Sequence, residues 1–538
     1  MNAVNGTGAL FRLDLRRDRW RILIWTLAVG LGVYGSVVAL EEAFPTPESI
    51  QARGSLLTNP ATLMMTGPAF AADDYTFGAM VANELSLYVF LAVGIMAILQ
   101  TVRHTRAEEE SGRLEMVRAL PVGRFAAPAA AIATVGLSAL LVGAATALGL
   151  LAVGHDGLDA ASSLAFGAAT ALTGLVFAAL ASVAAQLTEY ARGAAGLAMA
   201  GLAVSYLVRG IGDVIHHTGS WLSWFSPFAW AQQTRLFVDL RWWPLLVSLA
   251  VAVALFALAG VMATRRDLGA GLRPASKGPA TAARSLLAPA GLAERLQRGS
   301  ILVWAIGAFF FAVAMGALAN SLDDILEENP ALSQWMALEG TDLTAQFAGI
   351  ILSYVMIAPL IVGVSGVLTL KTEESSGRSE LLLVSGRPRV SVLAGWFGTV
   401  AVQVALLTVL GGLGVGLGVW AGTGQGRWIG EMTVAGIAYL PAILVVTALA
   451  VALFGLLPRL TVLAWPFVVF IALALFLGEL LQLPDWAMDL SPFTHVPALP
   501  AVEVGGAETV ALLVMTGIAV VLAAVGIAGY RRRDIASH

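Results

Sequence analysis

Few residues in this sequence have the types or spacing that catalytic or metal chemistry needs. Cysteine is absent, so thiolate metal ligands, disulfide bonds and a cysteine nucleophile are excluded. His104, His155 and His495 are scattered and form no metal-binding pattern. A nucleotide-binding P-loop needs Gly-Lys-Ser/Thr, whereas the two lysines of the chain, Lys277 and Lys371, follow a serine and a leucine. We therefore expect this chain to be no enzyme and to hold neither a metal nor a cofactor. Any ATP and Mg²⁺ would be bound by a separate subunit.

One acidic motif stands out because it occurs twice. Residues 108–115 read Glu-Glu-Glu-Ser-Gly-Arg-Leu-Glu, and residues 373–380 read Glu-Glu-Ser-Ser-Gly-Arg-Ser-Glu. In the first copy Leu114, Val117 and Leu120 have a helical spacing, which predicts a turn followed by a short amphipathic helix. Such a helix could dock in a groove of a partner protein and transmit force, although a solvated loop is the alternative. The repetition favours docking. The candidate docking residues are Glu108, Glu109, Glu110, Gly112, Arg113, Glu115, Glu373, Glu374, Gly377, Arg378 and Glu380.

A second group of candidates lies in apolar sequence, where a charged side chain is costly and often functional. Arg209 and Asp213 are four residues apart, which is close enough for an ion pair on one helix. Glu479 occupies the corresponding place later in the chain. The plainest interpretation is an ion pair at the outer membrane interface, together with a carboxylate that reaches water.

The elements that must position these residues are membrane-spanning helices. Hydrophobic residues make up 58% of the chain and charged residues only 12%, with a mean hydropathy of +0.82. A soluble domain carries about twice that fraction of charge. We therefore expect an all-α, multi-pass protein of the lipid bilayer with no nucleic-acid partner. Apolar windows of about 20 residues predict twelve spans at residues 22–40, 84–102, 126–153, 161–186, 194–215, 243–263, 300–320, 346–370, 391–421, 432–456, 461–483 and 506–529.

The placement of charge predicts the orientation of these spans. With the N-terminus in the cytoplasm, 26 of the 31 Lys and Arg residues fall on cytoplasmic segments. Because cytoplasmic segments of membrane proteins are enriched in Lys and Arg, both termini are expected inside. Arg16, Arg17 and Arg19 lie beside apolar residues and suggest an amphipathic helix at the cytoplasmic interface, before the first span. A polar tail is the alternative.

The self-similarity extends beyond the acidic motif. Ser-Pro-Phe at residues 226–228 recurs at 491–493, and Arg-Arg-Asp at 265–267 recurs at 532–534. A nearly constant offset predicts two copies of one structural unit. Six spans per copy is an even number, so the halves should be parallel and related by an axis along the membrane normal. The expected domains are a first half at residues 1–267, a cytoplasmic linker at 268–298 and a second half at 299–538.

Residues 106–124 resemble the first cytoplasmic loop of ABC-2 type permeases. In that family an acidic stretch precedes Gly-Thr-Leu-Glu, two apolar residues and Pro-Val-Ser-Arg. The sequence Ser-Pro-Phe-Ala-Trp at residues 226–230 is similar to the family's motif after span 5. The second copy departs more, with Ser379 in place of the leucine. The resemblance covers the whole chain and implies two parallel six-helix bundles like those of type V exporters.

The fusion of two halves in one chain resembles actinobacterial permeases of the tetronasin type, which export drugs and polyketide antibiotics. That resemblance implies ATP-driven export of a hydrophobic small molecule or lipid across the bacterial cytoplasmic membrane. It also implies two copies of a separate ABC ATP-binding subunit, docked on residues 108–115 and 373–380. Spans 2 and 5 of each half would line the pathway, which makes Arg209, Asp213 and Glu479 an outer gate. The residues expected to face the substrate are Tyr88, Met96, Tyr354, Met356 and Phe467.

Two other functional classes remain open on the sequence. A proton-coupled secondary multidrug transporter of the major-facilitator kind also has twelve spans in two parallel halves. Its loop after span 2 and its outer loops are short, however, whereas residues 103–125 and 41–83 are long here. A membrane scaffold or sensor is the third class, and the sequence supplies no receiver or catalytic domain for it.

Overall fold

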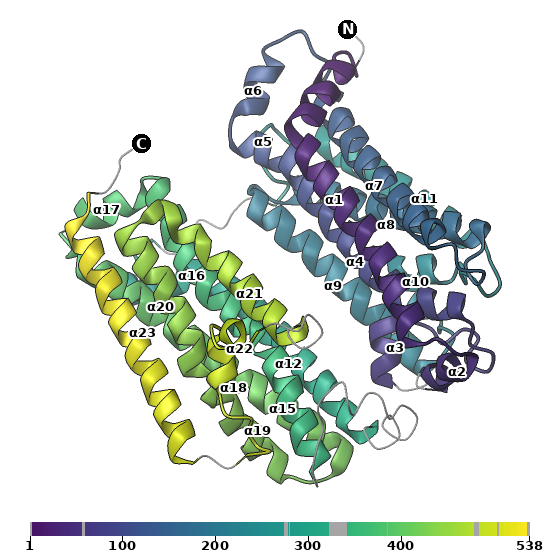
Figure 1. The fold of residues 1–538 in the computed structure, drawn as a ribbon. Helices are drawn as coiled ribbons and strands as arrows, with labels where there is room; N and C mark the ends of the chain where they lie inside the picture. Colours follow the sequence, from purple (N-terminus) through teal and green to yellow (C-terminus); the bar gives the residue numbers. More distant parts are fainter. Residues whose placement is uncertain are drawn as a thin grey trace. The chain divides into compact units, whose positions relative to one another are not determined.

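The computed structural model describes residues 3–55, 57, 60–273, 278, 280–321, 342–384, 386–477, 484–502 and 505–534. Over these ranges the chain forms α-helices, short 3-10 helices and turns, without a β-strand (Figure 1). The chain divides into two compact units, residues 1–278 (unit 1) and 279–538 (unit 2). The division falls inside the stretch expected to be a linker.

Twelve helical segments of the described chain are long and apolar enough to cross a bilayer, six in each unit. Lipid offers no hydrogen-bond partner to a bare backbone, so an apolar chain in a bilayer must satisfy its amides within helices. The expectation of an all-α protein with twelve spans is confirmed. The parallel relation of the two halves and the placement of both termini in the cytoplasm stay predictions.

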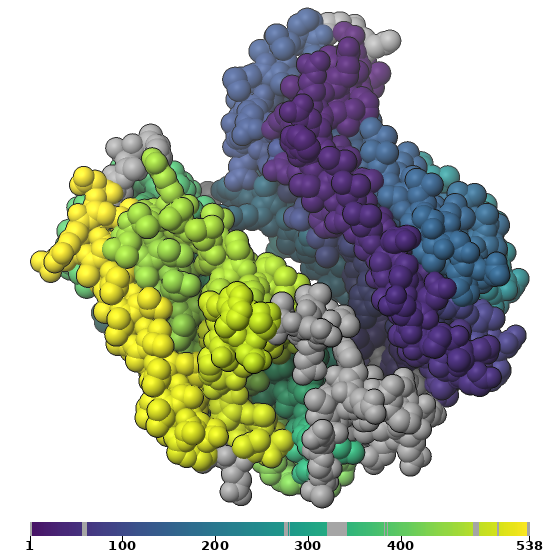
Figure 2. Space-filling model, viewed as in Figure 1, coloured from purple at the N-terminus to yellow at the C-terminus, as the bar shows by residue number. Residues whose placement is uncertain are grey.

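Unit 1 is built around helix α8, whose sides are rich in Ala, Gly, Ser and Thr. Small side chains allow close approach between helices in lipid, and α4, α7, α9 and α11 all pack against α8. Helix α1 lies on the surface of the unit along α7 (Figures 1 and 2). The helices of unit 1 are α1 (Thr7–Ala43), α2 (Pro47–Ser55), α3 (Pro60–Thr66), α4 (Phe77–His104), α5 (Arg106–Glu110), α6 (Arg113–Arg118), α7 (Ala126–Val153), α8 (Ala160–Leu187), α9 (Ala191–Ile215), η2 (Ser223–Phe225), α10 (Pro227–Gln232) and α11 (Trp243–Thr264).

Unit 2 has a similar series of long helices. Helix α18 packs against α12, α16 and α19, and the last helix, α23, lies on the surface of the unit against α20 (Figures 1 and 2). The elements of unit 2 are η3 (Arg284–Leu287), α12 (Pro289–Ala317), η4 (Leu318–Ser321), α15 (Leu343–Val355), α16 (Ile357–Ser375), α17 (Arg378–Val384), α18 (Arg389–Thr423), α19 (Arg427–Ala438), α20 (Leu440–Leu456), η5 (Pro458–Leu463), α21 (Ala464–Leu477), α22 (Asp485–Met488), η6 (Pro492–His495) and α23 (Gly506–Arg532).

Several spans differ in detail from the sequence expectation. The amphipathic stretch before the first span is not a separate interfacial helix, because α1 continues without a break from Thr7 to Ala43. Two spans of unit 2 are broken, at Met356 between α15 and α16 and at Tyr439 between α19 and α20. The second break is followed by Pro441, which lacks the backbone N–H that would continue the preceding helix. Most of the second long outer segment, residues 322–341, lies outside the described residues.

The repeated Ser-Pro-Phe motif proves to be a helix start in both units. The Ser226 hydroxyl accepts a hydrogen bond from the amide of Phe228 at 3.2 Å, at the start of α10. The Ser491 hydroxyl accepts one from the amide of Phe493 at 3.3 Å, at the start of η6. Serine at the N-cap and proline in the first turn are the residues that favour a helix start, because the cap satisfies a free amide and proline has none to satisfy.

Candidate functional site

The acidic segment of unit 1 is attached to the end of α11 through Glu109. Both carboxylate oxygens of Glu109 accept hydrogen bonds from the terminal nitrogens of Arg266, at 2.7 and 2.8 Å. Arg106 donates a further bond to Glu109 at 2.9 Å. All three side chains are nearly buried. A two-pronged pair of this kind fixes both distance and orientation, so α5 is held rigidly against the end of the sixth span.

The acidic segment of unit 2 is attached in the same manner through Glu374. Arg533, directly after α23, donates from both terminal nitrogens to the two carboxylate oxygens of Glu374, each at 2.7 Å. The guanidinium of Arg533 also lies over the rings of Phe454 and Tyr530, each 5.0 Å from the ring centre. Sequence reasoning noted the acidic motif and the Arg-Arg-Asp motif separately and missed that they are partners. We call these two ion pairs, Glu109–Arg266 and Glu374–Arg533, the loop clamps.

A glycine follows each loop clamp and turns the chain toward a short helix. Gly112 has φ of 73° and Gly377 has φ of 74°, in the left-handed region that glycine adopts without steric cost. Each glycine amide donates to the carbonyl of the clamped glutamate, Glu109 or Glu374, at 3.0 Å. The turn therefore has one geometry in both units, and α6 or α17 follows it directly.

Glu108 and Glu110 also have partners inside unit 1. Glu108 accepts hydrogen bonds from Arg17 at 2.8 Å and from Arg113 at 3.3 Å. Glu110 accepts one from the amide of Ala191 at 2.8 Å, at the start of α9. A carboxylate there satisfies a free amide and lies at the positive end of the helix dipole.

In unit 2, Glu373 and Arg378 form a two-pronged ion pair across the turn. Nε and a terminal nitrogen of Arg378 donate to the two Glu373 oxygens at 2.7 and 2.8 Å. These hydrogen bonds raise the pKa of Arg378 above its ordinary value. Most acids of the motif therefore pair within their own units, and their contact with a partner protein stays a prediction. Among the acidic residues of the motif that the structure describes, Glu115 and Glu380 are the two that make no ion pair or side-chain hydrogen bond.

The exposed surface of α6 carries three charged side chains, those of Arg113, Glu115 and Arg118, and one apolar side chain, that of Met116. Met116 is 66% exposed and Leu120, just after the helix, is 60% exposed, whereas Leu114 is buried. The face expected from Leu114, Val117 and Leu120 is therefore not a single surface, because α6 ends at Arg118 and Leu120 departs from the helical spacing. In unit 2, Val384 at the end of α17 is 85% exposed.

At the other end of unit 1, Arg209 and Asp213 form a buried ion pair, 3.4 Å apart, on α9. Arg209 also donates to the carbonyls of Leu63 and Met64, and Asp213 accepts from the Ser223 hydroxyl at 2.7 Å. The pair thus holds α3 and η2 against α9. Glu479, the third member of the expected outer gate, lies outside the described residues.

Comparison with known proteins identifies the family. The sequence model of a family described as "Multidrug efflux system permease Rv1217c, C-terminal domain" matches residues 9–265 and 286–531. The multidrug efflux system permease protein Rv1217c of Mycobacterium tuberculosis is 36% identical to this chain over 544 residues, covering 98% of this chain and 95% of the relative. The chain belongs to the Rv1217c family of multidrug efflux system permeases.

Membership of the Rv1217c family and twelve apolar helices make this chain a multi-pass membrane permease, a component of a transporter. In bacteria the membrane concerned is the cytoplasmic membrane. Expectations of a membrane permease and of its location are confirmed at this level. Coupling to ATP and the roles of individual residues stay predictions.

Five residues were expected to face the substrate. They differ from one another in burial and in their neighbours. Met96 and Met356 are fully buried within their own units. Tyr88 is 48% exposed on α4. Tyr354 packs against Phe476, with ring centres 4.6 Å apart, and Phe467 stacks on Phe470 at 6.2 Å. Tyr88 can meet a ligand without repacking of its unit, whereas the two methionines cannot.

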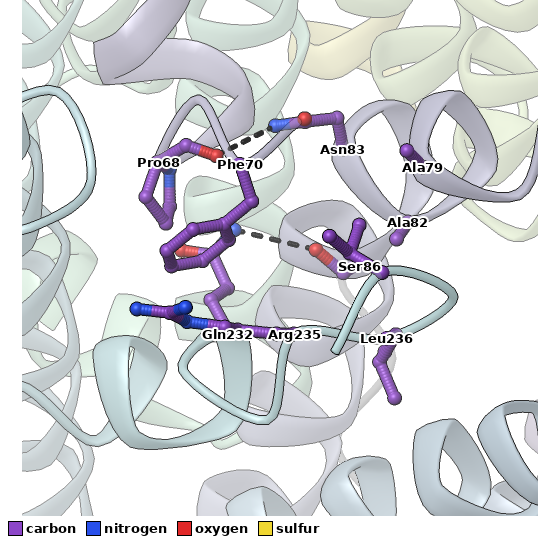
Figure 3. Close-up of a pocket in the computed structure, with 10 residues that line it drawn as sticks. Pro68, Phe70, Ala79, Ala82, Asn83, Ser86, Gln232, Arg235 and Leu236 are labelled. Atoms are coloured by element: carbon purple, nitrogen blue, oxygen red, sulfur yellow. Dashed lines mark hydrogen bonds between the residues drawn. The ribbon is translucent and has the colours of Figure 1, made fainter. Parts of the chain in front are cut away.

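A small cavity with a mixed polar and apolar lining lies between α4, the segment before it and the segment that follows α10 (Figure 3). Gln232 donates to the carbonyl of Thr66 at 2.8 Å and to the Ser86 hydroxyl at 3.3 Å. Arg235 lies over the Phe70 ring, 4.7 Å from its centre, and partial burial lowers its pKa. The cavity measures about 30 Å³, which is room for ordered water rather than for a drug.

A charged cluster that sequence reasoning missed joins α1 to α4. Asp18 is fully buried and its carboxylate is 2.7 Å from Nε2 of His104, 3.0 Å from Arg21 and 3.2 Å from Arg103. Asp14 lies 3.5 Å from the other ring nitrogen of His104. A signal was present in the sequence, because Asp14 and Asp18 are four residues apart among the arginines that precede the first span.

Proposed function

We propose that this chain is the permease of an ATP-driven ABC-2 type exporter, in which two parallel halves form the pathway for hydrophobic drugs, antibiotics or lipids. Two copies of a separate ABC ATP-binding subunit would dock on the cytoplasmic side, at α5–α6 and at α16–α17, and would bring ATP and Mg²⁺. The resemblance to ABC-2 permeases and the efflux permease of Mycobacterium tuberculosis named above support this proposal.

The observation that carries the proposal is the pair of loop clamps. Each unit presents a short helix beyond an acidic turn, and each turn is fixed to the end of that unit's last span by a two-pronged ion pair. A flexible loop would absorb a push from a partner, whereas a clamped helix passes it on to the spans. Such a link is what force transmission from an ATP-hydrolysing subunit needs.

The contact surface would be the exposed apolar tip rather than the carboxylates. Exposed apolar side chains at the centre of an interface contribute more to binding than charges at its rim. In unit 1 the tip consists of Met116 and Leu120, flanked by Glu115; in unit 2 it includes Val384, with Glu380 nearby on α17. The clamped glutamates would set the position of the tip.

The test is reconstitution with a candidate ABC ATP-binding subunit from the same organism. The complex is purified in lipid nanodiscs, and ATP hydrolysis and drug transport are compared for the wild type and for Met116→Glu/Val384→Glu. We expect loss of the subunit, or loss of its stimulation, in the variant. A matched control is Trp486→Glu, because Trp486 is 69% exposed on α22, which is not part of the acidic segment, and should leave coupling unchanged.

A second measurement decides between energy sources. Proteoliposomes that contain this chain alone are given a proton gradient without ATP. Drug transport under that condition would replace the proposal with a proton-coupled secondary transporter. Transport that needs both ATP and the added subunit supports the ABC assignment.

A further inference from the structure

A cavity of about 200 Å³ in unit 1 lies beside the loop clamp. It is formed where α4, α8 and α11 end and α7 begins, the end of the unit that carries the acidic segment. For comparison, a cavity of about 150 Å³ accommodates benzene. Its lining includes Arg118, Arg124, Arg266, Phe256, Gly260 and Ile132.

One side of this cavity is positively charged. Arg118, Arg124 and Arg266 line it together with a single carboxylate, that of Glu109. That carboxylate is already held by Arg266 and Arg106. Arg124 makes one hydrogen bond, to the carbonyl of Ala263 at 3.3 Å. The Arg118 side chain makes no ion pair or hydrogen bond with any described residue.

The first turn of α7 adds to the positive side. Residues 127–129 of this 28-residue helix line the cavity. The amide end of a long helix carries a partial positive charge and favours a bound anion. The arginines and the helix end therefore act in the same sense, and the cavity has an excess of positive charge.

The other side of the cavity is apolar and extends toward the bilayer. Phe256 lies eight residues before the end of α11 and Ile132 lies six residues after the start of α7. At 1.5 Å per residue the apolar lining thus reaches about 9–12 Å into the spans. Both α7 and α11 pack against α8, so α8 forms the back of the cavity between them. A side chain added at Gly260 would meet open space.

A ligand for this site must combine a negative charge at one end with an apolar body at the depth of the acyl chains. We propose that the cavity binds an anionic phospholipid of the cytoplasmic leaflet. Its phosphate lies between Arg118, Arg124 and the first turn of α7, and an acyl chain lies against Phe256 and Gly260. The leaflet follows from the orientation with both termini inside; lipid binding itself does not depend on an ATP-binding partner.

The proposed lipid site is adjacent to the loop clamp of unit 1, because Glu109 and Arg266 both line the cavity. Arg118 is the last residue of α6, and Arg266 joins the cavity to Glu109. A bound phosphate would stabilise α6 in its observed place by pairing with Arg118, the one arginine of the lining that has no partner. The lipid thus becomes part of the support of the docking helix.

The test titrates phospholipid onto the delipidated full chain, with binding read by native mass spectrometry. Phosphatidylglycerol is compared with phosphatidylcholine, and glycerophosphate is added as a soluble competitor. An arginine near a membrane surface contributes about 1 kcal/mol to anionic lipid binding, so Arg118→Ala/Arg124→Ala should bind phosphatidylglycerol about tenfold or more weakly. The control Arg192→Ala/Arg295→Ala removes the same charge from exposed positions that do not line the cavity and should bind like the wild type.

A second variant tests the apolar side without changing charge. Gly260→Leu fills the open space and raises helix propensity, so the protein should fold and lose phosphatidylglycerol binding. Equal binding of the two phospholipids, unchanged binding by both variants, or full displacement by glycerophosphate would each overturn the proposal. Displacement by glycerophosphate would assign the cavity to a soluble anion instead.

Discussion

Arg533 and Glu374 lie face to face, with both terminal nitrogens of the guanidinium 2.7 Å from the two carboxylate oxygens. The residues are 159 positions apart, yet the contact joins the end of the last span to the segment after the second span of the same unit. Glu109 and Arg266 make the corresponding contact in unit 1, across 157 positions. In each unit this ion pair adds a second attachment, to the end of the last span, beside the covalent connection of α6 to α4–α5 or of α17 to α16.

Breaking a loop clamp should destabilise its unit and uncouple its docking helix. We expect Glu374→Gln to lower the free energy of unfolding by about 2–3 kcal/mol, because it leaves the nearly buried Arg533 without its charge partner. The thermal transition in detergent measures the loss. The matched control is Arg17→Ala, which breaks a more exposed pair with Glu108 and should cost under about 1 kcal/mol. Equal losses in the two variants would contradict the clamp.

Much of the fold follows from the sequence, because the physics of a bilayer is simple. Apolar windows located all twelve spans, and the span at residues 126–153 has the bounds of α7. Hydropathy averaged over a window does not detect a break in a helix when the sequence stays apolar. The breaks at Met356 and Tyr439 were therefore not predicted. Average hydropathy also does not show that an arginine-rich helix continues into a span, as α1 does.

The sequence marks the acidic motif but not the partners of its carboxylates, and contact of the motif with a partner protein stays a prediction. An acidic motif in a loop looks like a surface for a partner, because sequence shows a charge without its counter-charge. Glu109 and Glu374 are paired with arginines more than 150 residues away, and only the tertiary fold brings them together. The common offset of the acidic and Arg-Arg-Asp motifs was the available signal, since residues that pair in one copy of a repeat should pair in the other.

The turn glycines offer a test of backbone geometry alone. An added Cβ at Gly112 or Gly377 would touch no other atom, so any cost comes from the left-handed backbone. Gly112→Ala should therefore destabilise unit 1 by about 1 kcal/mol. Gly196→Ala, inside α9 and equally free of neighbours, should instead stabilise it by a similar amount, about 1 kcal/mol. Thermal unfolding of both variants in one detergent measures the difference, and shifts of the same sign would contradict the assigned turn.

Substitutions at the buried ion pair of α9, Arg209 and Asp213, can distinguish a gating role from a purely structural one. Asp213→Asn leaves the fully buried Arg209 without a counter-charge and should cost about 3 kcal/mol or more of stability. Replacing both residues, as Arg209→Met/Asp213→Asn, removes the buried charge and should recover part of that loss. A double-mutant cycle by thermal unfolding gives the coupling. If the double variant is stable and transport persists, the pair is a tie for α3; loss of substrate exit in a stable double variant would identify a gate.

Because α20 and α23 are in close contact, folding should depend on the size of the side chain at position 526, which is a glycine. The space for a side chain at Gly526 is occupied by the backbone of Val451 and Ala452, so these helices touch through glycine. Gly526→Val should push α23 away from α20 and carry Arg533 with it, because Arg533 follows the same helix. We expect a lower yield of folded protein and a lower thermal transition, as overpacking typically costs about 1–3 kcal/mol. Gly517→Val, on α23 with no atom near its Cβ position, is the matched control and should behave like the wild type. A normal thermal transition for Gly526→Val would show that the last span is not held by this contact, and the loop clamp of unit 2 would then be its main attachment.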